Sequence, residues 1–86
     1  MAKFRKKPIV IEAMQWDGTI EGGNEIIEWS NGSASWFRGW TSRLVIVTKE
    51  GVMEVLSKQW VIRGIQGEFY PCATEIFEAT YDPVQP

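Results

Sequence analysis

The stretch that decides the fold of this chain lies in its middle and reads LVIVTKEGVMEVL, residues 44–56. Two runs of mostly apolar, largely β-branched residues flank Lys49-Glu50-Gly51, a pattern typical of a β-hairpin. A tight turn of this kind needs a residue with positive φ, which glycine adopts without steric cost. We therefore predict two antiparallel strands, 44–48 and 52–56, with Gly51 at the positive-φ position.

Further strands are predicted on both sides of this hairpin. A second hairpin follows it, in which residues 60–63 and 68–70 flank a turn at 64–67. Residues 9–16 read as a strand that is apolar on both faces, and residues 36–40 as an irregular strand. Because strands outnumber helices and hairpins dominate, we predict an α+β fold with a small, bent, mainly antiparallel and barrel-like sheet of about five strands.

One or two short helices complete the expected fold. Asn24 is a suitable N-cap for a helix over residues 25–30, with Ile26 on its core side, and Gly32 suits a left-handed stop. The segment 74–80 opens with a threonine that can cap a second short helix. Its apolar residues also alternate, so a strand is the alternative there, and the helix is the favoured interpretation.

Length and composition bound the class of protein. The 86 residues form a single domain, with residues 1–7 as a basic N-terminal arm and residues 82–86 as a frayed tail. Apolar residues make up 44% of the chain, which is enough for a globular core and too many for disorder. The sequence has neither an apolar run long enough for a membrane helix nor the apolar region of a signal peptide.

The residues that are missing exclude several chemistries. The chain has no histidine, which excludes Ser/His and Cys/His nucleophilic machinery and histidine-bearing metal sites. The single cysteine, Cys72, excludes an intrachain disulfide and a multi-cysteine metal centre. One unpaired thiol suits a reducing compartment, so we predict a cytoplasmic location and interpret Cys72 as a small core residue. No cofactor and no metal site are expected.

Charge is distributed unevenly along the chain. Four of the nine bases and none of the eleven acids lie in the first seven residues, so the remainder is acidic. The candidate phosphate contacts are Arg5, Lys6, Lys7, Arg38 and Arg63. The alternative is a solvated terminal strand whose charges protect an exposed edge from aggregation. The acidic remainder, which has no second basic stripe, argues against duplex nucleic acid as a partner.

The aromatic content is unusual for so short a chain. Five tryptophans are present, and they exceed what a core of this size readily hides. A pocket or platform for a flat ligand would use Trp16, Trp36, Trp40, Trp60 and Tyr70. The alternative is packing combined with a subunit interface, since aromatic residues are favoured in both. We therefore predict a homo-oligomer.

Carboxylates are the remaining candidates for catalysis. Glu12 and Glu54 interrupt otherwise apolar strand faces, and Glu68 follows a glycine turn. A buried pair would have separated pKa values and could perform acid–base chemistry. The alternative is that each faces water or pairs with Arg63 or Lys58. Because the carboxylates show no recognisable spacing, we assign no catalytic residue.

Several strings resemble a group of short bacteriophage and prophage proteins named after a Pro-Gly-Asp-Tyr-Gly motif. The matching strings are residues 1–16, 53–55, 60–64, 67–72 and 76–84. Relatives carry a Pro-Gly-Asp turn before an aromatic residue, whereas this chain has Ser57-Lys58-Gln59 before Trp60. The resemblance implies a phage origin and a compact fold, with the turn retained in different chemistry. It implies no reaction, and the role of the aspartate is not carried over.

Together these observations predict a phage-encoded, non-enzymatic binding protein in the host cytoplasm. It would sequester a host protein or a small nucleotide signal through an aromatic surface, as a homo-oligomer. One alternative is a small hydrolase that uses Glu12, Glu54 or Glu68 with a divalent ion. The other is a single-strand nucleic-acid binder that combines the basic arm with tryptophan stacking.

Overall fold

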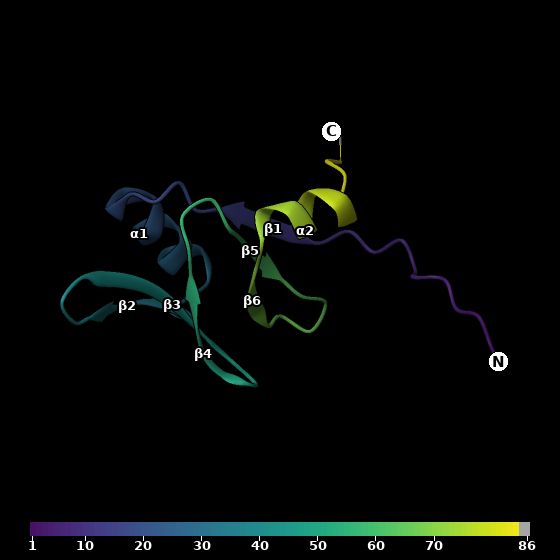
Figure 1. Ribbon diagram of the computed structural model, residues 1–86, viewed down its shortest axis with the longest axis horizontal. Coiled ribbons are helices and arrows are strands. Elements are labelled where there is room, and N and C mark those ends of the chain that lie inside the picture. Colours follow the sequence, from purple (N-terminus) through teal and green to yellow (C-terminus); the bar gives the residue numbers. More distant parts are fainter. Residues whose placement is uncertain (85–86) are drawn as a thin grey trace.

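The computed structural model describes residues 1–84 and contains two helices and six strands (Figure 1). The strands form two antiparallel three-stranded sheets, ordered β1-β5-β6 and β2-β3-β4. The elements are β1 (Glu12–Gln15), α1 (Ile20–Trp29), β2 (Ala34–Arg38), β3 (Ser42–Thr48), β4 (Gly51–Val55), β5 (Trp60–Arg63), β6 (Phe69–Cys72) and α2 (Thr74–Thr80). The predicted α+β class is confirmed.

Both predicted hairpins are present. In the first, β3 pairs with β4 so that Thr48 lies opposite Gly51, whose φ is 117°. In the second, β5 pairs with β6 around the turn, where Gly67 has a φ of 83° and its N–H donates to the Gly64 carbonyl at 3.0 Å. Turn chemistry acts within a few residues, so the local sequence was sufficient to predict both.

The prediction of a barrel-like sheet of about five strands is wrong, because the six strands divide into two open sheets and a barrel requires a closed ladder. β1 pairs with β5, with Glu12 opposite Arg63 and Gln15 opposite Trp60, whereas β2 pairs with β3. β6 packs against β3 and β4 and so brings the two sheets together. Local patterns identified the strands but carried no information on these long-range pairings.

Helix α1 begins at Ile20, earlier than predicted. Its N-cap is Thr19, whose Oγ1 accepts a hydrogen bond from the Gly22 N–H at 2.9 Å and donates one to Asp17 Oδ1 at 2.6 Å. The Thr19 hydroxyl and the Thr19 N–H, at 2.9 Å, both donate to Asp17 Oδ1 and hold the pKa of this carboxyl below its usual value. The cap was missed because two glycines follow it, and glycines are ordinarily read as helix breakers.

Gly23 lies inside the helix at a point where the Trp36 ring leaves no room for a Cβ atom. A Cβ at this position would lie closer than 3.0 Å to two atoms of the Trp36 ring. The same indole donates from Nε1 to Asn24 Oδ1 at 2.8 Å, so the residue predicted to cap the helix is instead the partner of Trp36. The predicted left-handed stop is present at Gly32, whose φ is 87°, but it begins one residue earlier, since Asn31 has a φ of 53°.

The buried core lies between α1 and the two sheets. It is formed by Ile26, Ala34, Leu44, Ile46, Val55 and Val61. Partly buried apolar side chains that pack against it include Met14, Trp16, Trp29, Trp36 and Phe69. The prediction that Ile26 faces the core is confirmed, since it is fully buried. Ile26 and the residues of β3 come together because the apolar faces of α1 and the sheet can only be hidden against each other.

Ser57-Lys58-Gln59 form a turn that connects four elements. The Gln59 N–H donates to the Leu56 carbonyl at 3.0 Å, and Lys58 between them has a φ of 73°. The Lys58 carbonyl accepts from Gln15 Nε2 at 2.9 Å and from Thr74 Oγ1 at 2.6 Å. The turn between β4 and β5 therefore also fixes the end of β1 and the start of α2.

The two ends of the chain differ from their predictions in part. β1 covers Glu12–Gln15 only, and residues 1–11 are extended without strand pairing, which includes the predicted basic arm. The favoured helix over 74–80 is confirmed, although Thr74 lies within the helix and Ala73 is its N-cap. Residues 82–84 have no regular structure, and residues 85–86 of the predicted tail lie outside the described residues. Neither helix in residues 1–84 is long and apolar enough to cross a membrane.

Candidate functional site

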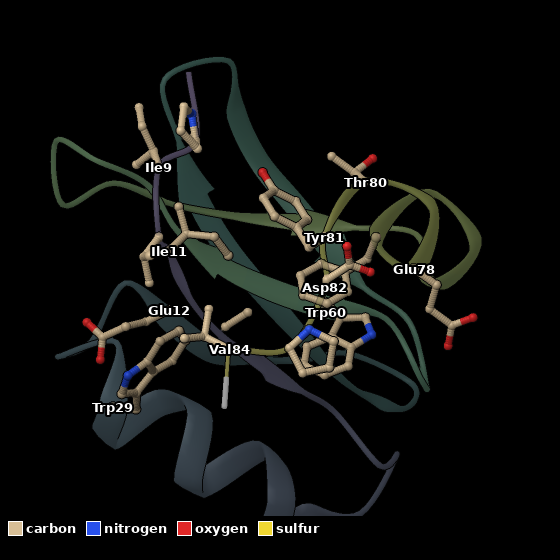
Figure 2. A pocket seen from close by; sticks show the side chains of 15 residues that line it. Ile9, Ile11, Glu12, Trp29, Trp60, Glu78, Thr80, Tyr81, Asp82 and Val84 are labelled. Atoms are coloured by element: carbon tan, nitrogen blue, oxygen red, sulfur yellow. The ribbon is translucent and has the colours of Figure 1, made fainter. Parts of the chain in front are cut away.

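A groove of about 940 Å³ separates the N-terminal segment from the C-terminal part of the chain (Figure 2). One wall is the extended segment 8–11 with the start of β1, and the other is α2 with the residues that follow it. Figure 2 shows Ile9 and Ile11 on one side and Tyr81 and Trp60 on the other. The two walls come from opposite ends of the sequence, brought together by the pairing of β1 with β5.

The C-terminal wall is a continuous run of rings, which we call the aromatic wall: Trp60, Phe77 and Tyr81. Trp60 and Phe77 stack with their centroids 4.1 Å apart and an interplanar angle of 10°, and Phe77 and Tyr81 lie 5.0 Å apart. The Trp60 Nε1–H is buried with no hydrogen-bond partner among the described residues. Ring packing rather than polar contacts therefore holds this wall.

The order of the aromatic wall follows from two local features. Phe77 and Tyr81 are four residues apart around the end of α2, so their side chains lie on the same side of the helix. Thr74 Oγ1 holds the start of α2 on the Lys58 carbonyl, close to the beginning of β5. This anchor sets the helix so that Phe77 covers Trp60 at the strand end.

The N-terminal wall is apolar and exposed. Ile9 is 46% exposed and Val10 is 73% exposed, although both are aliphatic side chains. Neither residue belongs to a strand, so their backbone groups have no partner in a ladder. An extended segment with free backbone groups and exposed apolar side chains is able to accept a further extended chain.

The charged side chains that line the groove are all acidic: Glu12, Glu78 and Asp82. Arg63 pairs with Glu12 at 3.3 Å, and this is the one ion pair within residues 1–84. A basic side chain does approach the groove, since Lys6 Nζ lies 4.9 Å from the centroid of the Tyr81 ring. The groove therefore combines apolar walls with negative charge, and its rim already holds one lysine by a cation–π contact.

The structure separates the five aromatic residues that were predicted to form one ligand surface. Trp16 and Trp36 meet edge to face at 6.1 Å beside α1, where both indole N–H groups are hydrogen-bonded. Trp40 is fully exposed between β2 and β3. Of these five residues, Trp60 alone lines the groove, which is also lined by Trp29 (Figure 2). Tyr70 instead lines a second cleft of about 700 Å³, between the β3–β4 turn and the β5–β6 hairpin.

The environment of Tyr70 is electrostatically distinct. Burial, followed by the proximity of Tyr81, raises the pKa of its hydroxyl above the usual value. The charged residues that line its cleft are of both signs, namely Lys49, Glu50 and Glu68. With one base and two acids, this cleft is less acidic than the groove, whose charged lining residues are all acids.

The five predicted phosphate contacts are also dispersed. Arg5, Lys6 and Lys7 lie on the extended arm, which leaves the body of the molecule (Figure 1). Arg38 ends β2, and Arg63 ends β5 and is paired with Glu12. Lys6 alone of the five is beside the aromatic wall, through its contact with Tyr81. The described residues thus form no single basic surface from this set.

The three carboxylates considered for catalysis lie in three different elements. Glu12 is in β1, Glu54 is in β4 opposite Val45, and Glu68 is in the β5–β6 turn, where its Oε2 accepts from the Gln66 N–H at 3.2 Å. Glu12 pairs with Arg63, one of the two bases expected for it. Among residues 1–84, no group of three or more acidic or cysteine side chains is placed to hold a metal ion.

Cys72 lies at the end of β6 and is partly buried. Burial raises the pKa of its thiol above the usual value, so the thiolate is disfavoured near neutral pH. Its Sγ contacts the Ala73 carbonyl at 3.6 Å. These surroundings match those of a structural cysteine rather than a nucleophile.

Of the residues that line the groove, Trp60 and Glu12 were singled out from the sequence as candidates, and the others were missed. Phe77 and Tyr81 were visible as an aromatic pair at helical spacing, which was the available signal for one wall. Ile9 and Ile11 were assigned to a strand, and both lie outside β1 because its pairing with β5 begins at Glu12, opposite Arg63. No protein-family model matches the chain, and no curated protein or solved structure matches it either. The resemblance to the phage group stays a prediction.

Proposed function

We propose that the protein is a non-enzymatic binding protein whose groove holds an extended polypeptide segment rich in apolar and basic side chains. The observation that carries this proposal is the lining of the groove, in which aliphatic and aromatic walls are accompanied by three carboxylates: Glu12, which is paired with Arg63, and Glu78 and Asp82, which form no ion pair among residues 1–84. Burial of apolar surface supplies affinity, at about 25 cal/mol per Å² before the costs of association. The carboxylates select basic side chains in the bound segment.

The same lining disfavours a nucleotide in this groove. Phosphate groups would be brought towards Glu78 and Asp82, and like charges at short range repel. The contact between Lys6 and Tyr81 supports the polypeptide instead, because it shows a lysine seated on the aromatic wall at 4.9 Å. A lysine of a bound segment would make the same kind of contact along this wall.

The source of the bound polypeptide follows from the resemblance to phage proteins. A phage accessory protein that holds a host polypeptide in the host cytoplasm needs no catalytic residue. The dispersed positions of Glu12, Glu54 and Glu68 support a role without turnover. Occupation of the groove would block the bound segment from its ordinary partners.

The test is calorimetric titration with short peptides. One peptide alternates lysine with isoleucine and phenylalanine, and a second has glutamate in place of each lysine. We expect saturable binding of the basic peptide and no measurable binding of the acidic one. Glu78→Gln with Asp82→Asn should weaken binding about two- to fivefold per carboxylate, as for rim ion pairs. Added salt should weaken binding in the same direction.

Matched controls separate the groove from the general charge of the protein. Glu21→Gln with Glu25→Gln removes the same charge from α1 and should leave peptide binding unchanged. Tyr81→Ala should reduce binding, whereas Trp40→Ala, at a fully exposed ring outside the groove, should not. Equal binding of both peptides, or binding of AMP or a cyclic dinucleotide in their place, would overturn the proposal. Turnover of a nucleotide with Mg²⁺ would overturn the non-enzymatic role.

A further inference from the structure

The N-terminal arm, residues 1–7, is an exposed extended segment with apolar and basic side chains. Met1 and Phe4 are almost completely exposed, as is expected of a segment that leaves the body of the molecule (Figure 1). The radius of gyration is 14.1 Å, whereas a compact chain of this length has one of about 12 Å. The arm therefore presents apolar surface that the rest of its own chain does not cover.

The arm has the chemistry that the groove selects. Its bases are Lys3, Arg5, Lys6 and Lys7, and Phe4 lies among them, followed by Pro8 and Ile9. The rest of the chain has five bases and eleven acids. The charged lining of the groove belongs to that acidic part. Arm and groove are complementary both in charge and in apolar character.

The arm is poorly placed to fill the groove of its own chain. Residues 8–11 form one wall of that groove, so the arm would have to reverse direction at Lys7-Pro8 to enter it. Proline fixes its own φ and favours extended backbone in the residue before it, which opposes a reversal there. Of the described arm residues, Lys6 contacts the aromatic wall of its own chain, where its Nζ lies over the Tyr81 ring at 4.9 Å from the centroid.

We infer that the groove takes the N-terminal arm of a second copy of the chain, so that two copies form a homodimer by reciprocal exchange of their arms. This inference rests on the proposed polypeptide-binding function of the groove. A two-fold arrangement fills both grooves and closes the assembly, as isologous contacts do. Seven extended residues span about 23 Å, which equals the shortest dimension of the molecule, 23 Å. A host segment would have to displace the arm, so the arm competes with the foreign partner.

The first measurement is the mass of the full chain in solution. Light scattering over a concentration series should give a species of twice the 9.8 kDa chain mass that dissociates on dilution. The basic peptide described above should convert this dimer to monomer, because both occupy the groove. A monomer at all concentrations would overturn the arm exchange.

The second measurement uses charge reversal. Variant A carries Glu78→Lys and Asp82→Lys in the groove, and variant B carries Arg5→Glu and Lys7→Glu in the arm. Each variant alone places like charges in both arm–groove contacts of its homodimer. The dissociation constant of that homodimer should therefore be at least about tenfold higher than that of wild type. In an equimolar mixture, the arm of each variant matches the groove of the other, and heterodimer formation should restore the wild-type affinity.

A control variant on α1 separates arm exchange from a general effect of charge. Glu21→Lys with Glu25→Lys on α1 should leave dimerisation unchanged. Dimers of A and of B as stable as wild type, or a mixture that stays monomeric, would overturn the inference. A monomeric wild type that still binds the basic peptide in a Glu78- and Asp82-dependent manner would overturn arm exchange and leave the proposed function intact. Failure of the peptide to bind a monomeric wild type would overturn both.

Discussion

Substitution of Gly23 by alanine tests the close approach between α1 and β2. The added Cβ would lie closer than 3.0 Å to two atoms of the Trp36 ring, whereas carbon atoms pack best at about 3.5–4.0 Å. The ring would therefore have to move by roughly 1 Å. Such a shift also strains the hydrogen bond from Trp36 Nε1 to Asn24 Oδ1, which is 2.8 Å long.

The expected magnitude is the balance of three contributions to the free energy of unfolding. Overpacking costs about 1–3 kcal/mol, and loss of the Trp36–Asn24 hydrogen bond costs about 1 kcal/mol. Replacing glycine by alanine in a helix returns about 1 kcal/mol. We expect Gly23→Ala to destabilise the protein by about 1–3 kcal/mol, which for a domain of this size lowers the melting temperature by about 5 °C or more.

The assay is urea and thermal unfolding followed by circular dichroism, with two comparison variants. Gly39→Ala adds a Cβ in ordinary contact with the Phe37 ring, at 3.5 Å, and should leave stability nearly unchanged. Gly23→Ala combined with Trp36→Leu should lose much less than the sum of the single substitutions, because the smaller side chain removes the clash. Unchanged or increased stability of Gly23→Ala would contradict the predicted clash, because the higher helix propensity of alanine would then outweigh the cost of overpacking against Trp36.

Three further predictions concern turns and caps. Gly51→Val should destabilise the fold by roughly 1 kcal/mol or more, because φ at this position is 117°; an unchanged urea midpoint would contradict it. Lys58→Gly should raise the free energy of unfolding by up to about 1 kcal/mol. Lys58 has a φ of 73°, and the hydrogen bonds from Gln15 and Thr74 use only its backbone carbonyl. A urea midpoint lower than that of wild type would exclude backbone strain at this position. The hydrogen bonds from Thr19 lower the pKa of Asp17. The ionised carboxylate therefore stabilises the fold above pH 3.8, and this stabilisation is lost as the pH falls further. In Asp17→Ala the free energy of unfolding should fall less steeply below about pH 4 than in wild type.

Part of the groove could be predicted from the sequence. Trp60 was identified from its residue type alone, as were the charges of the arm. The contact of Trp60 with Phe77 depends on the Lys58 turn, which fixes β5 and α2 relative to each other. The other wall depends on the point at which β1 stops pairing with β5. Neither property is encoded within a few neighbouring residues, so no local pattern could predict the groove.

Several local elements of this protein follow from short stretches of its sequence. Alternation and glycine placement specify the β3–β4 and β5–β6 hairpins, because a turn type constrains only the residues within it. The separation of the basic arm from the acidic body is likewise a property of neighbouring residues. For segment 74–80 the local pattern favoured a helix and left a strand open, and the structure has the helix. Ile26 could be assigned to the core because apolar spacing on a short helix defines a single face.

The way in which these elements combine depends on contacts between residues far apart in sequence. Pairing of β1 with β5 divides the strands into two open sheets, and this choice depends on which apolar faces are buried together. The close approach of Trp36 places Gly23 within a helix where a local reading of two adjacent glycines predicts a break. Packing energies of this kind come from residues far apart in sequence and outweigh the intrinsic preferences of single positions, which amount to about 1 kcal/mol each. The same long-range packing places the two ends of the chain on opposite sides of one groove.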